Sequence, residues 1–207
     1  MNNILKNFIV LEGLDGAGTT TQLKNLKVEL EKLSIKIYTT NEPTSRPIGK
    51  LVRTVLSGKF KTTDLALARL YSADRDDHLF NKEDGILKQI NNNMIVISDR
   101  YLYSSLAYQG VNCNFDKVFE LNKDFPHPQI LIYIETPIDE CLSRIEKRGE
   151  KKEIFEKKDF LTKVNNNYNK VINNLPEGIN LIKIDGTLSI DEITKIMIDG
   201  VRRIIHI

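Results

Sequence analysis

The amino-acid sequence predicts an α/β fold in which a five-stranded parallel sheet is covered by helices on both faces. Short β-branched runs alternate along the chain with longer stretches of helical periodicity, a pattern typical of βαβ units. Apolar residues make up 41% of the sequence and charged residues 28%, the balance of a globular protein rather than a disordered one. No internal repeat or low-complexity linker divides the 207 residues, so we expect one domain over 1–207.

Apolar periodicity predicts the place of each element. Five β-branched runs predict the strands, and they lie at 8–11, 35–38, 94–97, 130–134 and 181–184. After the first strand, leucines recur at three- and four-residue spacing and predict an amphipathic helix over 22–33. Similar patterns predict helices at 48–56, 65–80, 102–108, 138–148, 160–173 and 190–204. Residues 110–128 contain several Asn and two Pro, and they predict an irregular segment before the fourth strand.

Composition and charge limit the classes of partner. Thirty basic and 28 acidic side chains leave a formal net charge of +2, too little to indicate nucleic acid as the main partner. Cys113 and Cys141 lie far apart, without CxxC spacing or a histidine cluster, so neither a disulfide framework nor a zinc site is predicted. We find no secretory signal and no apolar run of the roughly 18 residues that span a membrane. We therefore expect a cytoplasmic protein without membrane contact.

The stretch after the first predicted strand reads GLDGAGTTTQ and predicts a phosphate-binding loop. In such a loop, glycines let backbone N–H groups converge on phosphate oxygens, a lysine neutralises the phosphates, and a hydroxyl holds Mg²⁺. The glycines are Gly13, Gly16 and Gly18. Thr20 stands at the position of the metal-binding hydroxyl, but Thr19 occupies the position of the lysine. An ordinary tight turn is the alternative interpretation.

Phosphoryl transfer would need another cation in place of the missing lysine. A pair of unit charges at about 4 Å contributes roughly 4 kcal/mol at an effective dielectric near 20, whereas a helix end supplies only about half a charge. We expect Lys24, one turn into the helix, to point away from the loop. Residues 144–158 mix basic and acidic side chains around Gly149 and predict a solvated lid that could fold over the site. Its candidate cations are Arg144, Arg148, Lys151 and Lys152.

Asp99 and Arg100 follow the third predicted strand directly. Open α/β sheets bind ligands at the carboxyl ends of their strands. An aspartate there can hold Mg²⁺ directly or through water, and an arginine can hold a phosphate with two hydrogen bonds. A surface ion pair that ends the strand is the alternative.

Further motifs follow the loop in a fixed order. They are Glu42-Pro43, then Ala73-Asp74-Arg75, then Asp99-Arg100-Tyr101 with SSLAYQG, then Arg144 to Gly149. With the aspartate inside the loop, this series resembles the thymidylate kinase family over 8–186, and the pattern DRYxxSSxAYQG is far more specific than glycines alone. The resemblance implies the P-loop nucleoside monophosphate kinase fold with a short basic lid. It also implies transfer of the γ-phosphoryl group of ATP to dTMP, with Mg²⁺, in dTTP synthesis.

The resemblance implies roles for residues around the sugar and phosphate of dTMP. Asp15 matches the carboxylate that contacts the 3′-hydroxyl, and Tyr108 matches the ring that disfavours a 2′-hydroxyl. Arg53 and Arg100 match the arginines that hold the phosphate. Glu42 matches a carboxylate near this phosphate and the metal.

Around the base, Arg75 matches the arginine that reaches the thymine. Tyr71 lies one helical turn earlier, at the position of the ring that stacks on the base. Packing in the core is the alternative for Tyr71. Polar positions of the dTMP site match Ser104, Ser105 and Gln109.

On the donor side, the resemblance extends the phosphate-binding segment over Ala17, Thr19 and Thr21, together with Arg144. Asp185 lies in a segment that resembles the loop flanking the adenine. The metal would be held by Thr20, Asp99 and Glu42. The residues assigned to catalysis are Asp15, Arg100, Arg148, Lys151 and Lys152.

The chain departs from the family pattern at several positions. Asn41 replaces an arginine that often precedes Glu-Pro. Arg46 stands in the segment that replaces a glycine pair, and there it could return the positive charge lost at Asn41. No arginine lies in the phosphate loop, which is typical of the lid-arginine branch. In that branch the lid arginine stands where this chain has Glu153 or Ile154.

Three hypotheses follow. The first is an active thymidylate kinase in which lid cations replace the charge missing at Thr19. The second is a related protein that binds nucleotide with weak transfer or none. The third is a kinase of the same fold for another nucleoside monophosphate or a deoxynucleoside. The resemblance also implies a homodimer.

Overall fold

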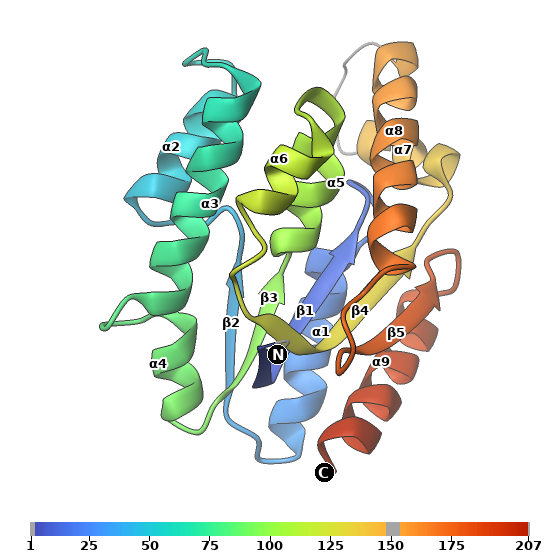
Figure 1. Cartoon of the computed structure of the whole chain (residues 1–207). Coiled ribbons are helices and arrows are strands. Elements are labelled where there is room, and N and C mark those ends of the chain that lie inside the picture. Colours follow the sequence, from blue (N-terminus) through green and yellow to red (C-terminus); the bar gives the residue numbers. More distant parts are fainter. Residues whose placement is uncertain (1–2, 148–153, 207) are drawn as a thin grey trace.

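The computed structural model describes residues 3–147 and 154–206. Within them, five parallel strands form one sheet in the order β2-β3-β1-β4-β5 (Figure 1). The strands are β1 (Ile4–Gly13), β2 (Ile37–Asn41), β3 (Ile95–Asp99), β4 (His127–Glu135) and β5 (Asn180–Asp185). The helices are α1 (Thr19–Lys32), α2 (Pro47–Leu56), α3 (Asp64–Phe80), α4 (Ile86–Asn91), α5 (Leu102–Asn112), α6 (Phe115–Glu120), α7 (Ile138–Lys147), α8 (Ile154–Ile172) and α9 (Ile190–Ile205).

Helices cover both faces of the sheet. On one face, α1 and α9 pack against each other and against the strands, while α4 and α5 contact the strands on the other face, where α8 packs along α5 (Figure 1). The central strands β1 and β4 are buried over most of their length because they lie between these two layers. This arrangement confirms the predicted fold class.

The register of the strands places three polar segments at one edge. Leu11 of β1 pairs with Asp99 of β3, and Asn41 of β2 pairs with the same residue. Gly13 pairs with Ile134 of β4. The segments that follow β1, β2 and β3 therefore leave the sheet side by side.

One prediction about local structure was wrong. Residues 110–128 are not irregular throughout, because α5 continues to Asn112 and α6 follows from Phe115. The side chain of Asn114 caps α6 by accepting hydrogen bonds from two backbone N–H groups. Of the predicted lid, 144–158, the described residues belong to α7, which ends at Lys147, and to α8, which begins at Ile154, and the role of this segment as a lid stays a prediction. The short helix α4 was not predicted.

Candidate active site

The loop between β1 and α1 has the backbone of a phosphate-binding turn. Gly16 and Gly18 adopt φ values of 89° and 95°, which strain any residue with a Cβ atom. A Cβ atom on Gly16 would also lie 2.5 Å from the carbonyl oxygen of Cys141. Gly18 is the N-cap of α1, and no side chain caps the first turn. The backbone N–H groups at the start of α1 thus have no capping side chain and can bind an anion.

Thr20 and Asp99 form a pair that suits a metal ion. The Thr20 hydroxyl donates to Oδ2 of Asp99 at 2.5 Å. The other carboxylate oxygen, Oδ1, is buried and has no hydrogen-bond partner in the described part of the chain. Mg²⁺ is typically bound by one or two protein oxygens together with phosphates and waters. The described residues contain no cluster of three or more His, Cys, Asp or Glu side chains that could hold a metal ion by themselves.

Thr19 brings no charge to the loop. Its side chain is buried, and its methyl group faces Gly13. Thr19 therefore leaves the phosphate loop without the positive charge that a lysine at this position would bring.

Arg100 is directed across the mouth of the loop. Its φ of 74° is unusual for a residue other than glycine. The guanidinium donates to Asp15 Oδ1 at 2.7 Å and to Ser104 Oγ at 3.1 Å, and it lies over the Tyr108 ring at 5.2 Å. The Tyr108 hydroxyl accepts from the backbone N–H of Asp15 at 2.8 Å. The predicted residues Asp15, Arg100 and Tyr108 thus form one connected group.

Glu12 lies beneath this group and was not predicted. It is completely buried, and its carboxylate accepts from the backbone N–H groups of Tyr101 and Ser104, at 2.9 and 3.1 Å. It also accepts from the hydroxyls of Ser104 and Tyr168, at 2.6 and 2.8 Å. Burial raises the pKa of Glu12 to about 7, although Arg100 and these hydrogen bonds oppose the shift. The sequence signal that could have identified Glu12 is a charged residue directly after an apolar run.

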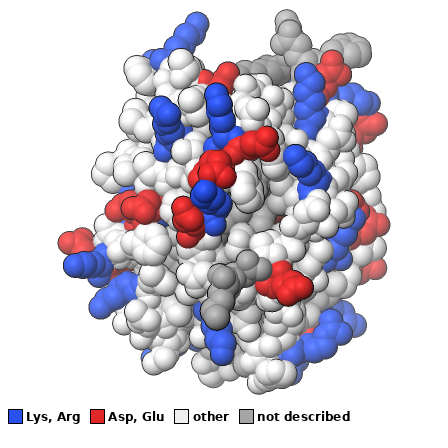
Figure 2. Space-filling view, in the orientation of Figure 1, with Lys and Arg blue, Asp and Glu red and all other residues white. Residues whose placement is uncertain are grey.

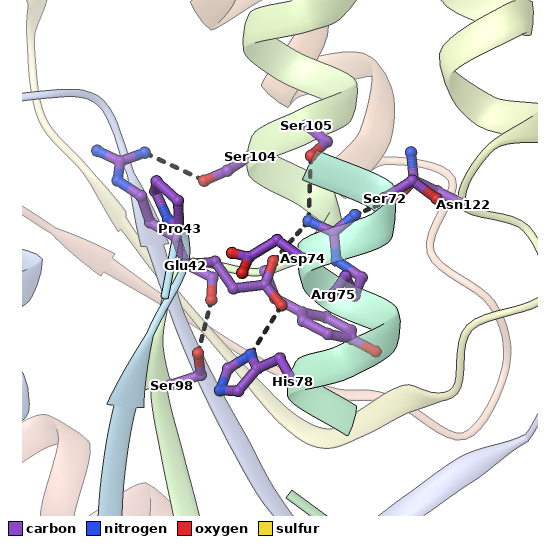
Figure 3. Close-up of polar contacts among 12 residues, drawn as sticks. Glu42, Pro43, Ser72, Asp74, Arg75, His78, Ser98, Ser104, Ser105 and Asn122 are labelled. Carbon is purple, nitrogen blue, oxygen red and sulfur yellow. Dashed lines mark hydrogen bonds and ion pairs between the residues drawn. The ribbon is translucent and has the colours of Figure 1, made fainter. Parts of the chain in front are cut away.

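A second buried group connects β2 to α3 (Figure 3). Arg75 donates to Glu42 Oε2 at 2.5 Å and to Ser105 Oγ at 3.0 Å, and it also bonds Asn122. Nδ1 of His78 lies 3.0 Å from Glu42 Oε1. Both oxygens of Glu42 therefore have protein partners, and its role as a metal ligand stays a prediction.

One cavity of about 880 Å³ joins these groups. All ten residues predicted for the dTMP site line it, and they are Asp15, Glu42, Arg53, Tyr71, Arg75, Arg100, Ser104, Ser105, Tyr108 and Gln109. Thr20 and Asp99 line it as well. Among its lining residues that sequence reasoning did not assign to the site are Lys24, Asp64, Asn112 and Phe160. The volume lies in the range of ligand pockets, about 300–1,000 Å³.

The predicted donor-side residues Arg144 and Asp185 are not among the residues that line this cavity. Arg144 donates to the carbonyl of Gly186 at 2.9 Å and to Glu140 at 2.7 Å, and its Nη1 lies 3.5 Å from the carbonyl oxygen of Ala17. It thus links the phosphate loop to the segment after β5. Asp185 accepts from the backbone and hydroxyl of Thr187, and these hydrogen bonds lower its pKa.

Arg46 and the lid residues are the remaining predicted cations. Arg46, which was predicted to return the charge lost where Asn41 replaces an arginine, pairs with Asp77 at 2.7 Å and with Asp84. The lid cations Arg148, Lys151 and Lys152 lie outside the described residues.

Comparison with known proteins identifies the family. A family model described as thymidylate kinase matches residues 11–196. The chain belongs to the thymidylate kinase family. It is 38% identical over 192 residues to a putative thymidylate kinase of Treponema pallidum, covering 91% of both chains. It is 38% identical over 203 residues to a probable thymidylate kinase of Methanocaldococcus jannaschii, covering 96% of this chain and 97% of the relative. A probable thymidylate kinase of Methanococcus aeolicus is 41% identical over 170 residues, or 82% and 81% of the two chains.

The family assignment confirms the resemblance found in the motifs. Within the described residues, none of the helices combines the length and apolar character that crossing a membrane requires. On the face shown in Figure 2, basic and acidic side chains are interspersed.

Proposed function

We propose that this chain transfers the γ-phosphoryl group of ATP to dTMP and releases dTDP and ADP. The observation that carries the proposal is the single cavity, in which a base- and sugar-binding end opens onto the Thr20–Asp99 pair beside the phosphate loop. A nucleoside monophosphate bound there would place its phosphate next to the γ-phosphate of ATP. Membership of the thymidylate kinase family supports the assignment of both substrates.

At the base-binding end, Tyr71 offers a flat neutral ring. Burial raises the pKa of its hydroxyl to about 12, so the phenol stays protonated at neutral pH. Arg75 is held rigidly by Glu42 and Ser105, which suits hydrogen bonding to a carbonyl oxygen of the base. Gln109 lines the same end of the cavity and adds a side chain that both donates and accepts.

At the sugar and phosphate, Asp15 and Tyr108 lie beside Arg100. In the proposed complex, Asp15 accepts from the 3′-hydroxyl and the Tyr108 ring lies against the 2′ position. Arg53 and Arg100 donate to the dianionic phosphate of dTMP. The chain thereby holds the acceptor oxygen in line with the γ-phosphorus, which is most of what a phosphoryl-transfer enzyme has to do.

We assign the metal site to Thr20 and Asp99, with Mg²⁺ as the ion. The orphaned Oδ1 of Asp99 and the neighbouring hydroxyl fit its preference for hard oxygen ligands. When bound, Mg²⁺ would neutralise negative charge on the phosphate oxygens. Asp99 keeps its carboxylate oriented through the Thr20 hydroxyl.

A coupled assay that follows ADP release tests the function. The purified chain with ATP, Mg²⁺ and dTMP is expected to turn over, with dUMP, dCMP and thymidine as competing acceptors. Asp99→Asn is expected to lower kcat by at least about 100-fold, because it weakens the metal site. Asp76→Asn, the same change on an exposed residue of α3, is the matched control.

The outcomes separate the three hypotheses. Absence of turnover at saturating substrate would overturn the proposal, and calorimetric binding of dTMP without turnover would favour a nucleotide-binding relative. Higher kcat/KM for another acceptor would favour a kinase of different specificity. The missing charge at Thr19 is the observation behind the binding-only alternative.

The proposal includes one domain over 1–207, a cytoplasmic location and a homodimer. Leu51 and Leu56 of α2, with Phe60 just after it, are 42%, 52% and 51% exposed, so this surface offers apolar side chains to a second copy. Light scattering of the purified chain is expected to give the mass of a dimer, and the mass of a monomer would refute this part.

A further inference from the structure

We propose that Lys24 supplies the positive charge that Thr19 does not bring to the transferred phosphoryl group. This inference rests on the proposed function and adds a catalytic residue to it. The sequence pattern alone had placed Lys24 pointing away from the loop, but the structure shows it lining the same cavity as Thr20 and Asp99.

The position of Lys24 on α1 lets its amine reach the metal pair. Thr20 and Lys24 are four residues apart on one helix, so they lie on the same face with Cβ atoms about 5–6 Å apart. Side chains on a helix lean toward its N-terminus. A Lys24 side chain that follows this general direction extends over the turn that carries Thr20, and its four-carbon stem is long enough to span the one-turn rise of about 5.4 Å.

Lys24 also differs from the other cations of the cavity in being free to bind a ligand. Of the described basic residues that line it, the three arginines have protein partners. Arg53 donates to the carbonyl of Pro43, Arg75 to Glu42, and Arg100 to Asp15.

The described residues give Lys24 no hydrogen bond or ion pair, and its side chain is exposed to the cavity and solvent. Lys27, one turn further on the same helix, lies 3.8 Å from Glu31 and does not line the cavity. Arg144 is held by Glu140 and by the Gly186 carbonyl. Lys24 is therefore the described cation best placed to move onto a phosphate oxygen.

The proposed role is electrostatic. An oxygen of the dTMP phosphate forms a bond to the γ-phosphorus, the bond from that phosphorus to the β–γ bridging oxygen breaks, and its electron pair leaves with ADP. Throughout the step, Lys24 donates a hydrogen bond to a γ-phosphate oxygen and keeps its proton. A donor of this kind stabilises charge that shifts in the transition state more than it stabilises the bound substrate.

The test compares variants of the 207-residue chain in which the positive charge at Lys24 is removed or moved to another position. Lys24→Met is expected to lower kcat by about 100-fold, the size of effect seen when one such donor is removed. The KM for dTMP is expected to change by less than about threefold, because Lys24 does not contact the base or sugar. Lys24→Arg should retain more activity than Lys24→Met, and Lys27→Met, the matched control on the same helix, should behave as the unsubstituted chain.

The decisive variant adds Thr19→Lys to Lys24→Met and is expected to restore kcat by at least about tenfold. Circular dichroism and thermal unfolding check that each variant folds, and Lys24→Gln replaces Lys24→Met if that variant does not. A kcat for Lys24→Met within about threefold of the unsubstituted chain, or no recovery on adding Thr19→Lys, would overturn the assignment. Turnover by the unsubstituted chain decides the proposed function separately, and if it were absent the role of Lys24 would fall with it.

Discussion

Glu12 makes the stability of this protein depend on pH in a way that can be calculated. Its carboxylate lies in the core beneath the phosphate loop and accepts four hydrogen bonds from Tyr101, Ser104 and Tyr168. Burial nevertheless raises its pKa from an ordinary value of 4.5 to about 7. The folded state therefore holds the Glu12 proton more tightly than the unfolded state does.

The sign and size of the effect follow from this difference. Because the folded pKa is raised, the contribution to stability is fully present below pH 4.5 and is lost as the pH rises through about 7. One pKa unit corresponds to about 1.4 kcal/mol, so the full difference is roughly 3 kcal/mol, of which about 2.5 kcal/mol lies between pH 5 and pH 8. Glu12→Gln removes the titration but keeps an oxygen that accepts from Tyr101 and Ser104.

Urea unfolding at several pH values between about 5 and 8 measures the effect. Between those limits the unfolding free energy of the unsubstituted chain should fall by about 2.5 kcal/mol relative to Glu12→Gln. Subtracting the variant removes the contribution of all other titrating groups. Glu120→Gln, on the exposed end of α6, should give a curve parallel to that of the unsubstituted chain. Parallel curves for Glu12→Gln and the unsubstituted chain would refute the reasoning.

Three further predictions concern the two halves of the site. Arg75→Met leaves Glu42 buried without its main partner and should lower the unfolding free energy by about 3–5 kcal/mol in urea unfolding; a loss below about 1 kcal/mol would contradict the burial argument. Gly16→Ala should cost at least roughly 1–2 kcal/mol, because φ is 89° and a Cβ atom meets the Cys141 carbonyl; the same measurement checks it, and an unchanged midpoint would count against the strain. Arg144→Met should raise the KM for ATP several-fold and leave that for dTMP unchanged, because it unties the phosphate loop from the segment after β5; equal shifts in both KM values would exclude this role.

The sequence alone determined the fold class and the place of the phosphate loop. Alternation of β-branched runs with helical periodicity is a local property, and it predicted the sheet that the structure shows. The spacing of glycines in the loop was equally readable, because a positive φ is a preference of single residues, here Gly16 and Gly18. The motif order that predicted the family is likewise a linear property of the chain.

Tertiary structure decided the partners of the charged residues. The sequence did not show that the two carboxylate oxygens of Glu42, a predicted metal ligand, lie against Arg75 and His78 of α3, more than 30 positions away. Glu12 became a buried acid only because α5 and α8 cover that end of β1.

The prediction that Lys24 points away from the phosphate loop rested on its place in the helix alone. Whether Lys24 lines the cavity depends on how α1 packs beside the carboxyl edge of the sheet. Spacing along a chain specifies which side chains share a face of a helix. It does not specify which residues of other elements will contact that face. The charge that Thr19 lacks could therefore be noticed in the sequence, while the residue that we propose as its replacement emerged only from the folded cavity.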